Sequence, residues 1–495
     1  MIEEALHKVL GDSQAKRQKD LIDRKDKCKI VWEKVKPLTK DQIIEYESLE
    51  VGEPSEIRNM LSKIAIVKLN GGLGTTMGLS GPKSTIVIRN RKNFLQLTFE
   101  QVMHINKQYQ VNIPIVIMNS FYTEVQTQEF VKQFPKLNII CFNQNQFPRL
   151  NRETLLPIAQ SRDAPDEYWY PPGHGDIYDC LHHYGTLDQL IGQGIEVLFL
   201  SNIDNLGATP DDRIMRQFLN PQKSKDANNT DILIELTSKL PVDVKGGTVI
   251  NYPLSDGSNQ MGFKLLEIAQ VPADHIDEFK SVRVFSVFNT NNVWIRTGFL
   301  KKTLETENLK LDVIQNPKNI PGLPPILQLE TACCAIVSCA KRIEIVHVHR
   351  LRFIPTKTCA DLMLLMSDYY ELLPYPNGEQ QQDDKEQKEK DQTEAKQEPC
   401  FLHVSKKRNF HTTTPSISLG PFYSTITDLQ KRCPHIPSLV DMEGLTVVGD
   451  VSFGSGVCIK GQVAVVAPTG QKLILPPGSV LDNVTVCGGL DITPR

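Results

Sequence analysis

The sequence predicts an α/β fold, with a mainly parallel central sheet flanked by helices and a C-terminal left-handed parallel β-helix. Three observations predict it: four short apolar runs, helical stretches between them, and a six-residue spacing of valine and isoleucine near the C-terminus. Strands that helices cover on both faces are continuously apolar rather than alternating, which favours a parallel sheet.

The apolar runs and the polar residues after them predict where a ligand binds. The predicted strands are KIAIVKL (63–69), IPIVIM (113–118), IEVLFL (195–200) and DILIEL (231–236), with a predicted helix at 96–108. Polar residues follow three of these strands, at Asn70, at Asn119 with Ser120, and from Ser201 to Asn205. Ligands of open sheets bind beyond the carboxyl ends of the strands, so we expect these residues to converge at one rim. Each group alone is equally typical of a turn, which Asn and Asp favour.

Residues 1–50 form a predicted N-terminal helical segment. Ile2, Ala5, Leu6, Val9 and Leu10 fall at helical spacing, which indicates a short amphipathic helix. The acidic start lacks the features of an export signal, and no run approaches the ~18 apolar residues that span a bilayer. We therefore expect a cytoplasmic protein with no membrane partner.

The rest of the chain divides into a main α/β domain (51–375), an insertion (376–399) and a β-helix domain (400–495). The insertion has Ala395 as its only apolar residue, so it is predicted to be disordered. In the last part the six-residue step is seen at Val451, Val457 and Val463 and then at Ile474, Val480, Val486 and Ile492, with Gly456, Gly461 and Gly478 nearby. This period indicates a β-helix, although ordinary sandwich strands are an alternative. A β-helix often serves as a platform for self-association.

The composition of the chain limits the classes of partner that it is expected to bind. The chain has 495 residues, of which 40% are hydrophobic and 23% charged, and its formal net charge is -3. This composition gives no general attraction to nucleic acid or to an anionic membrane. The eleven cysteines lack zinc-ligand spacing and are predicted to be buried thiols in a reducing cytosol.

A glycine-rich loop, LNGGLGTTMGLSGPKS, follows the first predicted strand. It does not fit a Walker loop, because Pro82 separates Gly81 from Lys83, and it does not fit a dinucleotide fingerprint, because three residues separate Gly74 from Gly78. Its amides and Lys83 nevertheless suit a nucleoside triphosphate. A flexible surface loop is the alternative.

Other motifs add the chemistry of phosphoryl or nucleotidyl transfer. YPPGHGDIY places His174 between two glycines, where it is either a ligand contact or a structural hydrogen-bonding group. Asp204 follows a predicted strand, and one carboxylate with ligand phosphates is a usual Mg²⁺ site. The stretches DVKGGT (243–248) and FNTNNVW (288–294) suit sugar hydroxyls, and Lys357 adds a positive charge. Positioning and charge neutralisation supply most of the catalysis in such reactions.

Together these motifs resemble the eukaryotic UDP-glucose pyrophosphorylase (UTP-glucose-1-phosphate uridylyltransferase) family. The resemblance runs from about residue 40 to the C-terminus and includes LNGGLGT, GPKS, YPPGHGDIY, SNIDNLGAT, DVKGGT, EIAQVP, FNTNN and QLETA in the family's order. The related N-acetylhexosamine pyrophosphorylases have GGQGTRLG where this chain has GGLGTTMG. The resemblance thus implies UTP and glucose 1-phosphate as substrates.

The resemblance implies a Rossmann-like nucleotidyltransferase domain at 51–375 and a Mg²⁺-dependent, reversible displacement. The phosphate of glucose 1-phosphate attacks the α-phosphorus of UTP, which gives UDP-glucose and pyrophosphate. By family position the catalytic residues are Lys357 and Lys83, with Lys357 the most critical. The implied nucleotide contacts are Leu69, Asn70, Gly71, Gly72, Lys83, Gln144, Gly173, Asp204 and Lys357. The implied substrate contacts are Gly71, Gly72, His174, Asn202, Ile203, Asp204 and Asn291, and the implied metal residues are Asp204 and, through phosphates, Lys83.

The sequence also departs from the family. Thr76 replaces a usual Ser, Leu79 and Ser80 are a different pair, LPVD (240–243) replaces TRAD, and LRFIPTKT (351–358) replaces SRFLPVKT. The C-terminus reads LDITPR, so the octamer of the fungal and animal enzymes, or another homo- or hetero-oligomer formed through the β-helix, is an open question. A weakly active or inactive paralogue that binds nucleotide or joins a true pyrophosphorylase is the alternative function.

Overall fold

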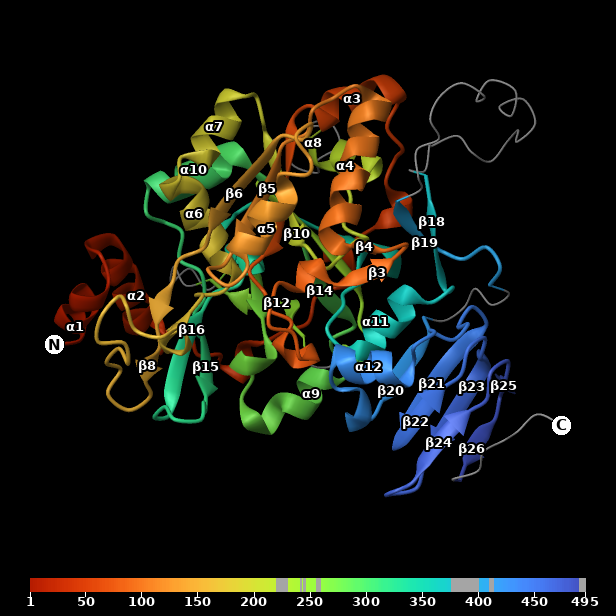
Figure 1. Cartoon of the computed structure of the whole chain (residues 1–495). Coiled ribbons are helices and arrows are strands. Elements are labelled where there is room, and N and C mark those ends of the chain that lie inside the picture. The colour runs from red at the N-terminus through yellow and green to blue at the C-terminus, as the bar shows by residue number, and fades with distance from the viewer. Residues whose placement is uncertain are drawn as a thin grey trace. The chain divides into compact units, whose positions relative to one another are not determined.

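The computed structural model describes residues 1–219, 230–240, 243, 246–254, 260–374, 400–408 and 414–488 (Figure 1). These residues belong to two compact units. Unit 1 comprises Met1–Gly71, Val111–Asn202 and Pro210–His349, and unit 2 comprises Gly72–Gln110, Ile203–Thr209 and Arg350–Arg495. The predicted domain boundaries stay predictions, and the predicted insertion at 376–399 lies outside the described residues, as do parts of LPVD and DVKGGT and the LDITPR end.

Unit 1 is built on a mainly parallel sheet of eight strands (Figure 1). In spatial order the strands are β1 (Ile44–Glu45), β17 (Ile343–His347), β11 (Ile232–Ser238), β14 (Val287–Arg296), β10 (Val197–Asn202), β2 (Ile64–Asn70), β5 (Ile115–Asn119) and β6 (Ile139–Asn143). Strand β14 is antiparallel to β10 and β11, whereas the other neighbours are parallel. All four predicted strands lie in this sheet, which confirms the predicted α/β class with a mainly parallel central sheet.

Helices α6 (Ile177–His183), α7 (Thr186–Gly192) and α10 (Thr297–Glu305) share a core with one face of the sheet. Leu181, Leu190 and Leu300 from these helices are buried in the same cluster as Val67 and Leu198. Successive strand residues point to opposite faces. The other face accordingly carries the residues next to those, such as Phe199, whose ring stacks on Trp294 at a centroid distance of 4.1 Å. The sheet is therefore buried on both faces, as its continuous apolar runs predict.

The remaining elements of unit 1 surround this sheet. They are α1 (Ile2–Val9), α2 (Asp12–Arg24), α3 (Pro54–Leu61), α5 (Glu124–Val131), β7 (Phe147–Pro148), β8 (Leu150–Asn151), β9 (Trp169–Tyr170), α8 (Asp212–Leu219), β12 (Thr248–Pro253), β13 (Met261–Leu266), α9 (Ile276–Lys280), β15 (Ile314–Lys318) and β16 (Ile326–Glu330). Helix α1 buries Leu6 and Val9 in a second core with Phe147, Trp169 and Leu329. This confirms the predicted amphipathic helix.

Unit 2 contains the glycine-rich loop, one long helix and the C-terminal strands. Its elements are β3 (Val87–Arg89), β4 (Lys92–Asn93), α4 (Phe94–Tyr109), α11 (Cys359–Met366), β18 (Tyr370–Leu373), β19 (Phe401–Val404), β20 (Ser416–Leu419), α12 (Ile426–Arg432), β21 (Met442–Val448), β22 (Asp450–Phe453), β23 (Cys458–Val466), β24 (Lys472–Leu475), β25 (Val480–Asp482) and β26 (Thr485–Cys487). Helix α4 confirms the helix predicted at 96–108. It begins where the Asn93 side chain accepts a hydrogen bond from the Gln96 amide.

The C-terminal strands pair in parallel, as a parallel β-helix requires. Strand β21 pairs with β20 and β23, β23 continues to β25 and β26, and β22 pairs with β24. The first predicted apolar series is buried: Val451 and Val457 are 0% exposed and Val463 is 4% exposed.

The second predicted apolar series is wrong at its first two members. Ile474 is 40% exposed and Val480 is 61% exposed, whereas Leu473, Leu475 and Leu481 are buried. Strand side chains alternate between faces, so Ile474 points away from the side on which Leu473 and Leu475 are buried. Val486, the next member of the series, is half-buried, and Ile492 lies outside the described residues.

Two further expectations concern cysteines and membranes. All eleven cysteines are free thiols, and six are buried: Cys180, Cys333, Cys334, Cys359, Cys400 and Cys433. Cys487 is exposed, so the prediction of buried thiols is wrong for that residue. Within the described ranges, no helix is long and apolar enough to cross a bilayer.

Candidate functional site

The three polar strand ends predicted to converge do meet at one rim of the unit 1 sheet. Asn70 at the end of β2 is in register with Asn119 at the end of β5, and Asn202 at the end of β10 is in register with Leu69. The Asn70 side-chain Nδ2 donates hydrogen bonds to Asn119 Oδ1 at 2.8 Å and to Thr127 Oγ1 at 2.9 Å. The rim is thus fixed by side-chain amides as well as by strand pairing.

Gly71 and Gln144 lie against each other at this rim. A Cβ added to Gly71 would lie 2.1 Å from Gln144 Nε2, so a side chain at position 71 would have to displace the amide of Gln144. The Gln144 backbone amide is held by Asn119 O at 2.8 Å, and Ser120 Oγ donates to Gly71 O at 2.8 Å. Gln144 Oε1 is buried and accepts no hydrogen bond from any described residue. Such an amide, with a donor beside an unused acceptor, suits the edge of a pyrimidine base.

The loop that carries His174 is held on residues Thr331 and Cys333. Gly173 has φ +88°, and a Cβ there would lie 2.5 Å from Thr331 O. The Gly175 amide donates to the same carbonyl at 2.9 Å, and the Cys333 amide donates to His174 Nδ1 at 3.0 Å. Since Nδ1 accepts this bond, the neutral imidazole carries its proton on Nε2. His174 therefore offers a fixed Nε2–H donor.

Asn291 occupies a β-bulge of β14. The register with β11 shifts between Glu235 and Leu236, and Asn291 has φ +59°, a left-handed conformation that Asn tolerates. Asn289 Nδ2 donates to Asn291 Oδ1 at 2.8 Å, while the Asn289 amide donates to Gly247 O at 3.0 Å. The FNTNNVW and DVKGGT motifs are therefore in contact through Asn289 and Gly247.

Cys334 links the bulge to the histidine loop. Its Sγ donates to Asn289 Oδ1 at 3.1 Å, and the preceding residue, Cys333, holds His174. Hence Gly71, Gln144, Gly173, His174, Asn202 and Asn291, six of the predicted site residues, all lie in unit 1 with Leu69 and Asn70.

Unit 2 holds the predicted charged residues and Gly72 and Ile203. Lys83 Nζ forms an ion pair with Asp204 Oδ2, with side chains 17% and 13% exposed. The Lys83 amide donates to Gly72 O at 3.3 Å and closes the glycine-rich loop at its base. The two arms of the loop also pair directly, because Leu73 and Pro82 form an antiparallel bridge.

Asn205 holds the segment before Lys357 beside the segment of Asp204. Its Nδ2 donates to Arg352 O at 3.0 Å, and its Oδ1 accepts from the Ile354 amide at 2.9 Å. Lys357 is exposed and lies just before α11, where its amide donates to Asp361 at 2.9 Å. Asp204 and Lys357 are thus on adjacent, hydrogen-bonded segments of unit 2.

A model of the family described as UTP–glucose-1-phosphate uridylyltransferase matches residues 14–460. The chain belongs to this family. It is 39% identical over 477 residues to the UTP–glucose-1-phosphate uridylyltransferase of Saccharomyces cerevisiae, which covers 95% of this chain and 87% of the relative. It is also 39% identical over 469 residues to that of Hordeum vulgare, covering 94% of this chain and 90% of the relative.

Solved structures agree with this family assignment. The UDP-glucose phosphorylase from Trypanosoma brucei matches with a TM-score of 0.82 and 31% identity, covering 98% of this chain and 99% of its own. A mutant of UDP-glucose pyrophosphorylase from Leishmania major, in complex with UDP-glucose, matches with a TM-score of 0.84 and 28% identity over the same shares.

In this member of the uridylyltransferase family, the available metal ligands suit an ion that is bound partly by protein and partly by substrate phosphates. No group of three or more His, Cys, Asp or Glu side chains in the described residues can hold a metal ion. Asp204 supplies a single carboxylate and already has a cation, the Lys83 ammonium group, as its partner. Mg²⁺ is commonly bound by one or two carboxylates together with substrate phosphates, and Asp204 fits that arrangement.

Several residues of the site were not singled out from the sequence. Asn145 and Asp176 connect the Gln144 and His174 segments, and Thr331 and Cys333 hold the histidine loop. Asp176 and Thr331 stand inside two motifs of the resemblance, YPPGHGDIY and QLETA, so their motif membership was an available signal. Their contacts depend on the tertiary structure.

Proposed function

We propose that this chain is a UTP–glucose-1-phosphate uridylyltransferase, which forms UDP-glucose and pyrophosphate from UTP and glucose 1-phosphate. The observation that carries this proposal is the Gln144 amide, whose buried Oε1 accepts no hydrogen bond from the described residues and lies beside Gly71 at the carboxyl rim of the sheet. Uracil presents a carbonyl and an N–H side by side, and this amide can pair with both. Relatives with the same activity in their names, at 39% identity, support the same assignment.

We assign binding of the sugar phosphate to His174, Asn202 and Asn291. The Nε2–H of His174 can donate to a phosphate oxygen, because Nδ1 is already used by the Cys333 amide. Asn202 ends β10 at the rim, and the bulge turns Asn291 out of the regular strand. Hydrogen bonds from fixed donors of this kind position the attacking phosphate.

We assign the neutralisation of the phosphate charges to Lys83 and Lys357, and to Mg²⁺ held by Asp204. The proposed chemistry is a direct displacement in which a phosphate oxygen of glucose 1-phosphate bonds to the α-phosphorus of UTP and pyrophosphate leaves. Lys83 and Lys357 neutralise the negative charge of the reacting phosphates. Mg²⁺, when bound, supplies further charge neutralisation at the phosphates, and Asp204 is the residue that would hold it.

The first test is pyrophosphate release from UTP, glucose 1-phosphate and Mg²⁺ by the wild-type protein and by Lys357→Ala. Removing one preorganised charged group costs about 3–4 kcal/mol in the transition state, so we expect kcat to fall by about 10²–10³-fold. UTP binding, measured by calorimetry, should weaken far less than kcat falls.

Lys407→Ala is the matched control. Lys407 is an exposed lysine of unit 2 whose side chain forms no ion pair or hydrogen bond with a described residue. Its substitution should leave the rate unchanged. If the wild-type protein binds UTP and releases no pyrophosphate, the transferase assignment is wrong and the inactive paralogue becomes the better interpretation.

Location and assembly are part of the same proposal. We assign the protein to the cytoplasm and the parallel C-terminal strands to a β-helix that mediates self-association. Among the described strands, β20 ends the sheet β20–β21–β23–β25, and its outer edge is where we propose that a second copy pairs. Light scattering of the full chain and of a chain with a charged substitution on β20 tests this assignment.

A further inference from the structure

Asp176 joins the two loops of unit 1 that carry Gln144 and His174. Its Oδ2 accepts a hydrogen bond from the Asn145 amide at 2.6 Å, and both carboxylate oxygens accept from Asn145 Nδ2 at 2.9 Å. Asn145 directly follows Gln144, and Asp176 is two residues beyond His174. One carboxylate therefore fixes the separation between the base-reading segment and the sugar-phosphate segment.

This carboxylate is buried, so it needs a counter-charge. Asp176 is 6% exposed, and the thiol of Cys180 donates to its Oδ2 at 3.2 Å. Burial and, after it, the Asp176 carboxylate raise the pKa of the Cys180 thiol, so this neighbour stays protonated and supplies no positive charge. Burying a carboxylate without a charged partner is costly.

Arg17 of helix α2 supplies the counter-charge. Its NH2 group lies 3.6 Å from Asp176 Oδ1 and also forms an ion pair with Asp179. The same helix contacts the Gln144 segment twice more, because Gln14 donates to Asn145 Oδ1 at 3.2 Å and Gln18 donates to Pro148 O at 2.8 Å. Helix α2 is thus docked on the loop that follows β6.

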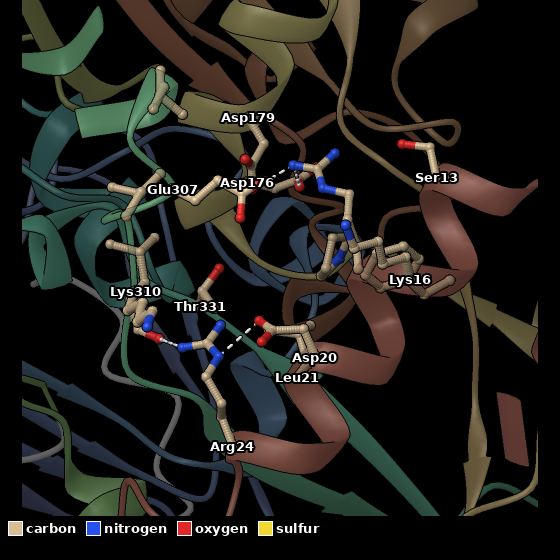
Figure 2. Close-up of a pocket in the computed structure, with 16 residues that line it drawn as sticks. Ser13, Lys16, Asp20, Leu21, Arg24, Asp176, Asp179, Glu307, Lys310 and Thr331 are labelled. Carbon is tan, nitrogen blue, oxygen red and sulfur yellow. Dashed lines mark hydrogen bonds and ion pairs between the residues drawn. The ribbon is translucent and has the colours of Figure 1, made fainter. Parts of the chain in front are cut away.

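A cavity of about 580 Å³ separates helix α2 from the histidine loop and reaches this ion pair (Figure 2). Its walls include Ser13, Lys16, Asp20, Leu21 and Arg24 from α2, Asp176, Asp179 and Thr331 from the site side, and Glu307 and Lys310 (Figure 2). A small cation can therefore reach the position of the Arg17 guanidinium.

We propose that Arg17 and Asp176 are a positioning pair for the transferase reaction, through which helix α2 holds the Gln144 and His174 loops at the separation that UTP and glucose 1-phosphate require. Both residues act through the segments of Gln144 and His174, to which the substrates are assigned. The expected change in KM rests on the proposed function. The expected change in hydrogen exchange rests only on the contacts above.

The test is Arg17→Ala, assayed by steady-state kinetics and by hydrogen exchange of the full-length protein. We expect the KM values for UTP and glucose 1-phosphate each to rise by about 5–50-fold with kcat changed less than about twofold, because loosely held loops lose ground-state and transition-state binding alike. Amides of 142–147 and 172–178 should exchange faster. Arg17→Lys, which keeps the charge, should restore most of the binding.

Arg24→Ala is the matched control, and guanidinium is the rescue probe. Arg24 lies on the same helix and the same cavity, but it pairs with Asp20 and with Leu311 O, away from both loops. Its substitution should leave both KM values and the exchange unchanged. Millimolar guanidinium should lower the raised KM values of Arg17→Ala and should not affect the wild type.

Two outcomes would overturn the inference. In the first, Arg17→Ala has the KM values and hydrogen exchange of the wild type. In the second, Arg24→Ala changes the KM values and the exchange as much as Arg17→Ala does, and guanidinium rescues neither variant. The second outcome would mean that helix α2 only stabilises the fold. Failure of the proposed function is distinguishable, because the wild-type protein would then release no pyrophosphate. The exchange measurement decides the positioning role even in that case.

Discussion

Substituting Gly71 with alanine should weaken UTP binding by displacing Gln144. The added Cβ would lie 2.1 Å from Gln144 Nε2, a distance that real Cβ atoms do not adopt, so the side-chain amide must move by about an ångström or more. An amide displaced this far loses its hydrogen bonds to the base. Two neutral hydrogen bonds contribute about 1–3 kcal/mol together, which is about 5–150-fold in the dissociation constant.

The assay is titration calorimetry of UTP with the wild type, Gly71→Ala, Gln144→Ala and the double variant. Because Gly71 is itself a predicted nucleotide contact, the double variant separates the two effects. If the alanine acts through Gln144, it should cost little more once Gln144 is already truncated. Gly298→Ala in α10 is the control, since its added Cβ has no atom within 4 Å.

Two results would refute this reasoning. Unchanged UTP affinity in Gly71→Ala would mean that Gln144 does not read the base. An equal loss in the wild-type and Gln144→Ala backgrounds would mean that the methyl group obstructs the ligand directly. The second result would keep Gly71 in the site and remove Gln144 from the explanation.

Further predictions test the bulge and the C-terminal register. Asn291→Val should lower the free energy of unfolding by about 1–2 kcal/mol more than Asn291→Gly, because a β-branched residue strains at φ +59°; equal urea midpoints for the two variants would contradict the left-handed conformation. Leu473→Ala should destabilise by about 2–5 kcal/mol, and Ile474→Ala, at 40% exposure, by under about 1 kcal/mol. The reverse order in chemical unfolding would restore the register predicted from sequence.

The sheet and its rim were predictable because they depend on local patterns. Continuous apolar runs predict strands that are buried on both faces, and parallel strands place their carboxyl ends at one edge. Asn70, Asn119 and Asn202 each follow such a run, so their convergence needs no knowledge of the strand order. The order itself, with antiparallel β14 between β10 and β11, is a tertiary property that the runs do not encode.

The C-terminal register shows where a sequence pattern is insufficient. A six-residue step repeats equally well on either face of a strand, because six is an even number and side chains alternate with period two. The buried Leu475 and Leu481 lie twelve and eighteen residues after Val463, so the first series keeps its phase beyond the turn at Gln471, and Ile474 points outwards. Pattern alone fixes the step and leaves the face open.

His174 shows why two alternative interpretations of one residue, as a structural hydrogen-bonding group and as a ligand contact, can both hold. As a structural residue, His174 accepts a hydrogen bond from the Cys333 amide through Nδ1. This bond requires the proton of the neutral ring to be on Nε2. The same bond therefore creates the Nε2–H donor that the proposed reaction uses. Gly173 and Gly175 allow the loop to approach Thr331 closely enough for the bond to form. The structural role of the histidine is thus the cause of its functional one, and weakening the Cys333 contact should impair glucose 1-phosphate binding without any change to the side chain that binds it.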